Sequence, residues 1–266
     1  GLSMAVGTNA FVLTKNRLED VMPYLTYLRV NFSGGEKKRY AEIMGVKESS
    51  YDRVCQNIRD MVEIKKKNNL KVTIGMQMVL MPQDADQIIP LAKLGKELRP
   101  DYVIIKHCSD NEDGGLGINY DEYEKLYPLL KEAEGYSDKT YKCVIKWSKI
   151  KDKGNNKRSY QRCYGAPFML QLSGSGLVAP CGALFNEKYK KFHIGNICDT
   201  RFKDIWKSDR YWEVMNYLAS PKFNAQKMCA SLCLQHKVNE ALDDFVKGKG
   251  DLKQPSTGSP EHINFI

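Results

Sequence analysis

Residues 163–181, CYGAPFMLQLSGSGLVAPC, place one cysteine on each side of a predicted β-hairpin. The segments 168–172 and 177–179 are apolar, and the SGSG between them has the small residues that tight hairpin turns require. Cys163 precedes the hairpin and Cys181 follows it, with seventeen residues between them. Because a hairpin ladder holds its two ends close together, we expect these two thiols to be neighbours.

A second cysteine pair, Cys229 and Cys233, has three residues between its members and lies near a predicted helix. One helical turn separates the two positions, so both side chains share a face. Four converging thiolates suit a soft metal. Iron-sulfur clusters use four cysteines at variable spacings, whereas structural zinc sites favour cysteine pairs with two to four residues between them. The wide first spacing favours a cluster over zinc, and buried cysteines without a metal are the third interpretation.

The first half of the chain alternates predicted strands with predicted helices, a pattern typical of parallel strands joined by crossover helices. In residues 27–33, Leu28 and Val30 point to one face of the strand while Arg29 and Asn31 point to the other. We expect the polar face to line the interior of a barrel. The predicted strands are residues 2–8, 27–33, 72–80 and 101–107, and the predicted helices are 15–22, 50–68 and 84–98.

Changes in composition divide the 266 residues into four segments. Residues 1–135 form the α/β part, and residues 136–160 form a connecting strand followed by a polar linker. Residues 161–240 form a small α+β domain around the hairpin. The Gly-, Pro- and Ser-bearing residues 241–266 are predicted to be an irregular tail.

The overall composition excludes several classes of protein. No apolar run is long enough to span a bilayer, and the first ten residues lack the pattern of a secretion signal, so we expect a cytoplasmic protein. Eight cysteines in a long chain of this kind indicate metal or redox chemistry rather than disulfides. The formal net charge is +9, but basic and acidic residues are interspersed, which argues against nucleic acid as a partner and hints at anionic ligands.

Five motifs after residue 160 together resemble the twitch domain, the shortened form of the SPASM domain that follows the barrel in many radical S-adenosylmethionine (radical SAM) enzymes. The resemblance implies one auxiliary [4Fe-4S] cluster, because the second cysteine-rich block of a full SPASM domain is absent. The implied ligands are Cys163, Cys181, Cys229 and Cys233, with Cys198 as a less favoured substitute. The motifs are CYGAP at 163, Gly176 followed by four residues and Cys181, HIGNI at 193–197, FKDIW at 202–206, and the Cys229, Cys233 pair.

The first half resembles the barrel of the same superfamily through TNA at 8–10 and RVNFSG at 29–34. The implied fold is a partial (β/α) TIM-like barrel missing its first strands, followed by the small twitch or SPASM domain. The CxxxCxxC loop of the family does not occur in these residues, and we interpret the chain as N-terminally truncated. Cys229, Cys233 and His236 reproduce the spacing of that loop, but they fall in the wrong domain.

In the complete enzyme, the resemblance implies a catalytic 4Fe-4S cluster, an external one-electron donor and reductive cleavage of S-adenosylmethionine to a 5′-deoxyadenosyl radical. That radical would remove a hydrogen from a peptide, sugar or other small molecule. The fragment alone is expected to be inactive. The candidate residues for S-adenosylmethionine or substrate are Asn9, Ser33, Gln77, Lys106 and His107.

Simpler interpretations stand beside these candidates. Asn9 and Ser33 suit turns, and Gln77 suits a satisfied core amide. Two other classes of protein also remain open, a zinc-stabilised binding module and a single-cluster electron carrier.

Overall fold

The computed structural model describes residues 3–110, 114–151, 158–229 and 233–252. These residues form two compact units. The first unit contains residues 3–108 and 118–151, and the second contains the remaining described residues. Among the described helices, none combines the length and hydropathy that crossing a bilayer requires.

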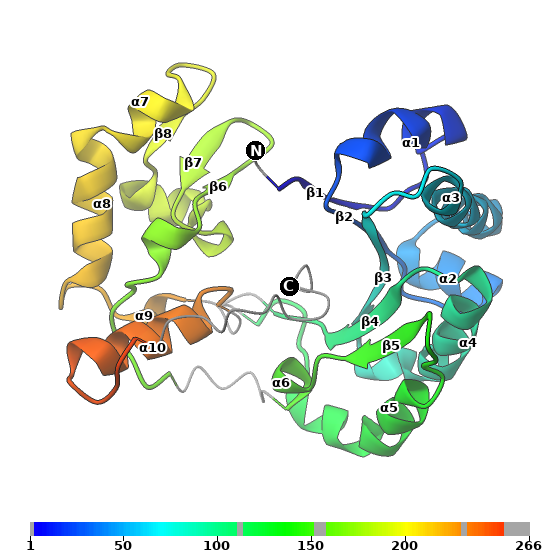
Figure 1. Ribbon diagram of the computed structural model, residues 1–266. Coiled ribbons are helices and arrows are strands. Elements are labelled where there is room, and N and C mark those ends of the chain that lie inside the picture. Colours follow the sequence, from blue (N-terminus) through cyan, green and yellow to red (C-terminus); the bar gives the residue numbers. More distant parts are fainter. Residues whose placement is uncertain (1–2, 111–113, 152–157, 230–232, 253–266) are drawn as a thin grey trace. The chain divides into compact units, whose positions relative to one another are not determined.

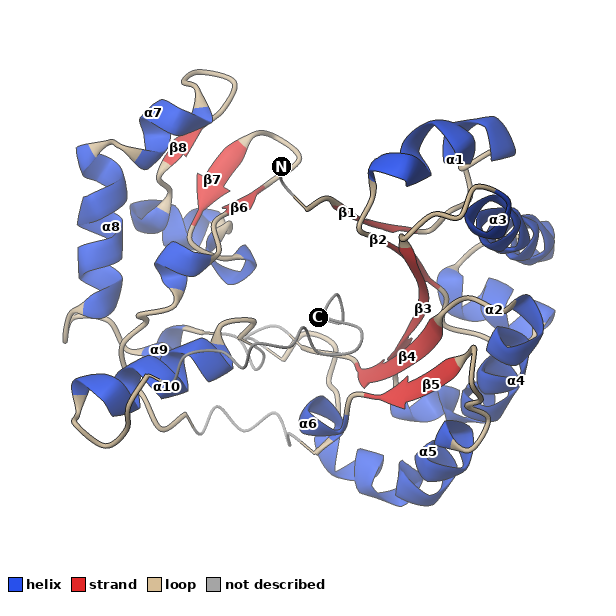
Figure 2. Ribbon diagram, viewed as in Figure 1, coloured by secondary structure: helices blue, strands red, loops and turns tan. Residues whose placement is uncertain are grey.

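The first unit is built on a five-stranded, fully parallel sheet whose strands follow their order in the sequence (Figure 1). All five α-helices from α1 to α5 lie on one face of this sheet (Figure 2). This architecture confirms the predicted α/β class and the partial barrel. The strands are β1 (Ala5–Thr8), β2 (Tyr27–Asn31), β3 (Thr73–Leu80), β4 (Tyr102–His107) and β5 (Lys142–Ile145).

The helices of this unit pack their apolar stripes against the sheet. In α3, Val54, Ile58 and Met61 are buried, as their spacing predicts, and they join Leu28 and Val30 of β2 in one core. The helices are α1 (Lys15–Val21), α2 (Lys37–Met44), α3 (Glu48–Lys67), α4 (Ile88–Leu98), α5 (Tyr127–Glu134) and α6 (Trp147–Ile150), with 3₁₀ turns η1 (Met22–Tyr24), η2 (Pro82–Gln87) and η3 (Tyr120–Leu126).

The opposite face of the sheet carries a separate set of side chains. Tyr27, Tyr102 and Ile104 form a small cluster of their own on this face. Parallel register pairs Arg29 with Gly75, and Gly75 with Tyr102. A Cβ at Gly75 would lie 2.1 Å from Cζ of Tyr102, so the tyrosine ring occupies the space that a side chain would need. The predicted polar face of residues 27–33 is this second face.

Strand β5 differs from the domain boundaries expected from the sequence. It pairs in parallel with β4 from Tyr102 opposite Lys142 to Ile105 opposite Ile145, so it is the fifth strand of the sheet rather than part of a connection. Helix α6 follows it within the same unit. Residues 152–157 of the expected linker lie outside the described residues.

The second unit combines a three-stranded antiparallel sheet with short helices. The predicted hairpin is present: Ser173 N–H donates to the Leu177 carbonyl at 2.9 Å, and Gly176 adopts a positive φ of 82° at the turn. Its first strand is shorter than expected because residues 166–168 form a 3₁₀ turn. The strands are β6 (Gln171–Leu172), β7 (Leu177–Ala179) and β8 (Gly195–Asn196).

The helices of the second unit enclose a core of aromatic and aliphatic side chains that includes Phe192, Tyr211, Val214 and Phe223. The last helix continues to Val246, beyond the residue 240 at which the sequence predicts an irregular tail. Residues 253–266 of that tail lie outside the described residues. The helices are α7 (Phe202–Trp206), α8 (Asp209–Ala219), α9 (Ala225–Met228) and α10 (His236–Val246), with 3₁₀ turns η4 (Ala166–Phe168), η5 (Gly182–Leu184) and η6 (Glu187–Phe192).

Candidate metal centre

Cys163 is held between two helices of the second unit. Its backbone N–H donates to the carbonyl of Leu218 at the end of α8, at 2.9 Å. Its sulfur accepts from Nδ2 of Asn239 in α10, at 3.7 Å. Gly165 lets α10 approach this closely, because a Cβ there would lie 2.8 Å from Cβ of Gln235. The glycine of the CYGAP motif is therefore needed because a larger residue would clash with α10.

Cys181 directly follows the hairpin and begins η5. Its carbonyl accepts from Leu184 N–H at 3.1 Å, which closes a tight turn. The backbone N–H groups of Ala183 and Leu184 lie close enough to its sulfur to oppose the effect of burial on its pKa. Both ends of the hairpin thus present a thiol toward the same part of the unit.

Cys229 and Cys233 occupy the connection between α9 and α10. Cys229 ends α9, with its N–H donating to the Ala225 carbonyl at 3.3 Å. The carbonyl of Cys233 accepts from His236 N–H at 3.1 Å, just before α10 begins. Cys229 therefore caps the end of α9 and Cys233 lies three residues before α10, whereas the spacing predicts that both lie on one turn of a single helix.

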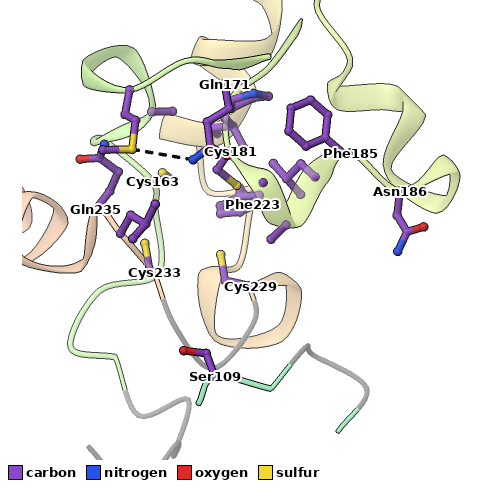
Figure 3. Close-up of a pocket in the computed structure, with 18 of the residues that line it drawn as sticks. Ser109, Cys163, Gln171, Cys181, Phe185, Asn186, Phe223, Cys229, Cys233 and Gln235 are labelled. Atoms are coloured by element: carbon purple, nitrogen blue, oxygen red, sulfur yellow. Dashed lines mark hydrogen bonds between the residues drawn. The ribbon is translucent and has the colours of Figure 1, made fainter. Parts of the chain in front are cut away.

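All four cysteines line one cavity of about 630 Å³ in the second unit. Figure 3 shows their sulfur atoms facing the same space, with Phe223 and Gln235 also on its wall. The remaining lining is mainly apolar. It includes Ala166, Met169, Pro180, Ala183, Leu184, Leu218 and Leu234. The structure therefore brings together four thiols from two distant segments of the chain, the same four that the sequence analysis identified as candidate ligands.

Burial dominates the acid-base behaviour of three of these thiols. It raises the pKa of Cys181 to about 11 and the pKa of Cys229 to about 12, and it also raises the pKa of Cys163. The positive charge of buried Arg158 opposes the rise in the pKa of Cys229, and the amide of Asn239 opposes that of Cys163. Without a metal, Cys163, Cys181 and Cys229 are therefore protonated at neutral pH, so binding of a metal must displace their protons.

The arrangement fits a multi-iron cluster better than a single ion. Four thiolates around one zinc at about 2.3 Å would place their sulfurs about 3.8 Å apart. A 4Fe-4S cluster is larger than a single ion, and an all-cysteine donor set is the ligation that such clusters use. The cavity of about 630 Å³ that the four thiols line is mainly apolar and has room for a cluster of this size.

The five candidate residues for S-adenosylmethionine or substrate all lie in the first unit. Asn9 accepts from Phe11 N–H at 3.1 Å through its side chain, which is a local turn contact. Ser33 is buried, and its hydroxyl accepts from Val79 N–H at 3.3 Å beside a small polar cavity. Gln77 is 4% exposed and donates to Oδ1 of Asn31 at 3.1 Å. The side-chain oxygen Oε1 of Gln77 has no hydrogen-bond partner among the described residues.

Lys106 and His107 point to opposite faces of β4. Lys106 shares the face of Tyr102 and Ile104, where burial and the positive charges of Lys149, Arg29 and Lys146 lower its pKa to about 8. His107 lies on the other face, with its ring packed edge-on against Tyr120 and tilted against Tyr123. Cys198, the less favoured ligand, is exposed and lies beside Ser175 at the hairpin turn, and it does not line the cavity.

Two residues of the site were not identified from the sequence, Asn239 and Arg158. Asn239 is fully buried in α10, one helical turn after the capping Gln235. The two buried residues of α10 are polar, Asn239 and Asp243, whereas Phe245 and Val246 are exposed, so the hydrophobic periodicity of this helix gives no signal for Asn239. Arg158 precedes the CYGAP motif in a basic, polar stretch that gave no sign of burial.

Residues 163–234 match the SPASM family, described as an iron-sulfur cluster-binding domain. This segment contains all four cavity cysteines. The second unit therefore contains a SPASM-type domain, as the cysteine motifs predict. No curated protein matches the chain in sequence.

The fold of the chain is also found in solved structures of radical SAM enzymes. Streptococcus suis SuiB bound to S-adenosylmethionine superposes with a TM-score of 0.58 at 16% identity, covering 87% of this chain and 55% of SuiB. The structure of anSMEcpe with bound AdoMet gives a TM-score of 0.50 at 14% identity, covering 85% of this chain and 64% of anSMEcpe. The chain thus has the fold of a radical SAM enzyme with a SPASM domain, and it spans just over half the length of SuiB.

Proposed function

We propose that this chain holds one auxiliary 4Fe-4S cluster on Cys163, Cys181, Cys229 and Cys233 and works as the SPASM-bearing part of a radical SAM enzyme. The observation that carries the proposal is that these four thiols line a single mainly apolar cavity. The match of residues 163–234 to an iron-sulfur cluster-binding family supports it independently.

The residues around the cavity are suited to such a group. The bound cluster supplies one-electron redox chemistry. Arg158, Asn239 and the backbone N–H groups after Cys163 and Cys181 provide positive charge or dipoles that offset the negative charge of four thiolates. The aliphatic and aromatic wall limits the access of water to the sulfurs.

We assign S-adenosylmethionine and the substrate to the second face of the first unit's sheet, opposite the helices, where Ser33, Gln77 and Lys106 lie. The unpartnered side-chain oxygen Oε1 of Gln77 is suited to an amino or hydroxyl donor. Asn9 and His107, with their local contacts, contribute less. A peptide is the favoured substrate class, because SuiB has been solved with its precursor peptide SuiA, at a TM-score of 0.57 to this chain.

The 266 residues contain no CxxxCxxC motif, so we expect this chain alone not to cleave S-adenosylmethionine. The complete activity requires that motif, a catalytic cluster and an external electron donor. A reducing cytoplasm suits the eight free cysteines.

Metal analysis of the anaerobically purified or reconstituted chain tests the cluster. We expect about four irons and about four sulfides per chain and a brown protein. Replacement of any of the four cavity cysteines by serine is expected to lower the iron content sharply, whereas Cys198→Ser keeps it. A colourless protein with one zinc per chain would instead establish the zinc-stabilised module.

A second experiment separates an enzyme from an electron carrier. Protein that includes a CxxxCxxC segment, supplied with S-adenosylmethionine and dithionite, is expected to release 5′-deoxyadenosine. Absence of the nucleoside from protein carrying both clusters would favour the carrier.

A further inference from the structure

Asn239 makes an unusual set of contacts for a helix residue. Its side-chain oxygen accepts from the backbone N–H groups of Tyr164 and Gly165, at 2.7 and 2.8 Å. Its side-chain nitrogen lies 3.7 Å from the sulfur of Cys163. The side chain is fully buried, so water does not compete for these contacts.

The orientation of this amide is fixed by its partners. Two backbone N–H groups converge on one end of the side chain, and only the carbonyl oxygen can accept both. The NH₂ group must therefore face Cys163. The same two bonds hold the backbone directly after Cys163, so Asn239 both positions this cysteine and directs a donor at its sulfur.

A donor to a ligating sulfur has a defined electrostatic effect. Reduction of a cluster by one electron adds one negative charge, which spreads onto the thiolate sulfurs, and an N–H dipole aimed at sulfur stabilises that charge. Hydrogen bonds to the sulfurs are among the factors that set cluster potentials. The effect is strong in a buried, mainly apolar site because the local dielectric is low.

We propose that Asn239 is a positioning residue that raises the reduction potential of the auxiliary cluster through its N–H···S bond to Cys163. The inference rests on the proposed function, since it requires a cluster on Cys163. It adds a determinant from α10, five residues beyond the segment that matches the SPASM family.

The test is a redox titration of the reconstituted 266-residue chain, with dithionite as the one-electron reductant and the reduced cluster followed by EPR. Asn239→Asp, measured near pH 8, keeps an oxygen for the two backbone N–H groups but replaces the donor by a carboxylate. Asn239→Leu removes both functions at similar volume. We expect each variant to be at least tenfold harder to reduce, equivalent to about 59 mV lower potential for one electron.

A matched control separates electrostatics from helix stability. Asp243 is buried one turn further along α10, pairs with Lys247 and does not line the cavity of the four thiols. Asp243→Leu is expected to lower the stability of the unit while leaving the potential of the cluster unchanged.

The outcomes are distinct. If the wild-type chain carries a cluster and the clusters of both Asn239 variants have the same reduction potential as that of the wild type, the role of Asn239 is refuted. The proposed function stands in that case. If Asp243→Leu lowers the potential as much as Asn239→Asp does, the effect is merely structural and the inference also fails. A wild-type chain that takes up no cluster overturns both proposals.

Discussion

Replacing Gly165 by alanine tests whether the CYGAP motif needs a glycine so that α10 can pack closely against it. The backbone at Gly165 is ordinary right-handed helical, with φ −81° and ψ −13°, so alanine is conformationally acceptable there. On backbone grounds alone the change would stabilise the chain by about 0.4–1 kcal/mol, because alanine has less freedom than glycine when unfolded. The structure predicts instead that Gly165→Ala lowers the free energy of unfolding.

The predicted cost comes from crowding. The new Cβ would lie 2.8 Å from Cβ of Gln235 and 3.3 Å from Nδ2 of Asn239, well inside normal carbon contacts of about 3.5–4.0 Å. The Cβ of Gln235 is fixed to the backbone, so α10 itself must retreat. Overpacking of this kind costs about 1–3 kcal/mol. Weakening the two buried bonds to Asn239 adds about 1 kcal/mol, for a loss of about 2–4 kcal/mol.

Urea unfolding of the metal-free chain in a Trp147→Phe background, followed by the fluorescence of Trp206 and Trp212 in the second unit, measures this loss. Gly174→Ala at the hairpin tip is the matched control, because no atom lies within 4 Å of its new Cβ. We expect the control to remain within about 0.5 kcal/mol of the wild type. A Gly165→Ala chain as stable as the wild type, or more so, would refute the steric account of the motif.

Three further predictions concern the first unit. Gly35→Ala should cost at least about 3 kcal/mol, seen as a lower thermal midpoint by circular dichroism, because its Cβ would lie 2.2 Å from the backbone nitrogen of Leu91. Lys106→Met should stabilise the chain at pH 7 by about 1 kcal/mol after allowance for solvent screening. The pKa of Lys106 is lowered to about 8, so this gain should be lost as pH rises from 8 through 10.5, and equal gains at pH 7 and 11 would contradict it. Asn57→Ala should cost about 1–3 kcal/mol in urea unfolding, because Asn57 donates to the buried carbonyl of Ala10 at 2.7 Å, and an unchanged midpoint would show that this bond is dispensable.

The strands of the first unit were predictable because their side chains alternate or run continuously apolar. Residues 101–107 predict β4 to within one residue, and residues 27–33 contain β2. The assignment of β5 to the sheet was not predictable from its four residues. Its place depends on parallel pairing with β4, a partner forty residues away that no local pattern specifies. Helix α2 was missed, since Lys37, Lys38 and Arg39 give its start no apolar stripe.

The candidate site shows a similar division. The four cysteines were identifiable because thiols are rare and their spacing carries meaning, and the turn at Ser173–Gly176 places two of them. The contribution of Asn239 arises only when α10 packs on Gly165, so it depends on tertiary contacts between residues 74 positions apart. The sequence identified Gln77 but could not assign its role, because its position in the strand pattern suits a hydrogen-bonded core amide as well as a binding residue. The unpartnered side-chain oxygen, which is visible only in the structure, separates the two interpretations.

The position of α10 has a consequence for how relatives of this protein are compared. The recognisable segment ends at residue 234, whereas the amide that touches Cys163 lies at residue 239. Two homologues with identical cysteine motifs can therefore differ at the position of Asn239 in this helix. On the proposal made above, their clusters would then differ in the free energy of accepting an electron. Classification by ligands alone would group them together, while the residue just downstream would distinguish them.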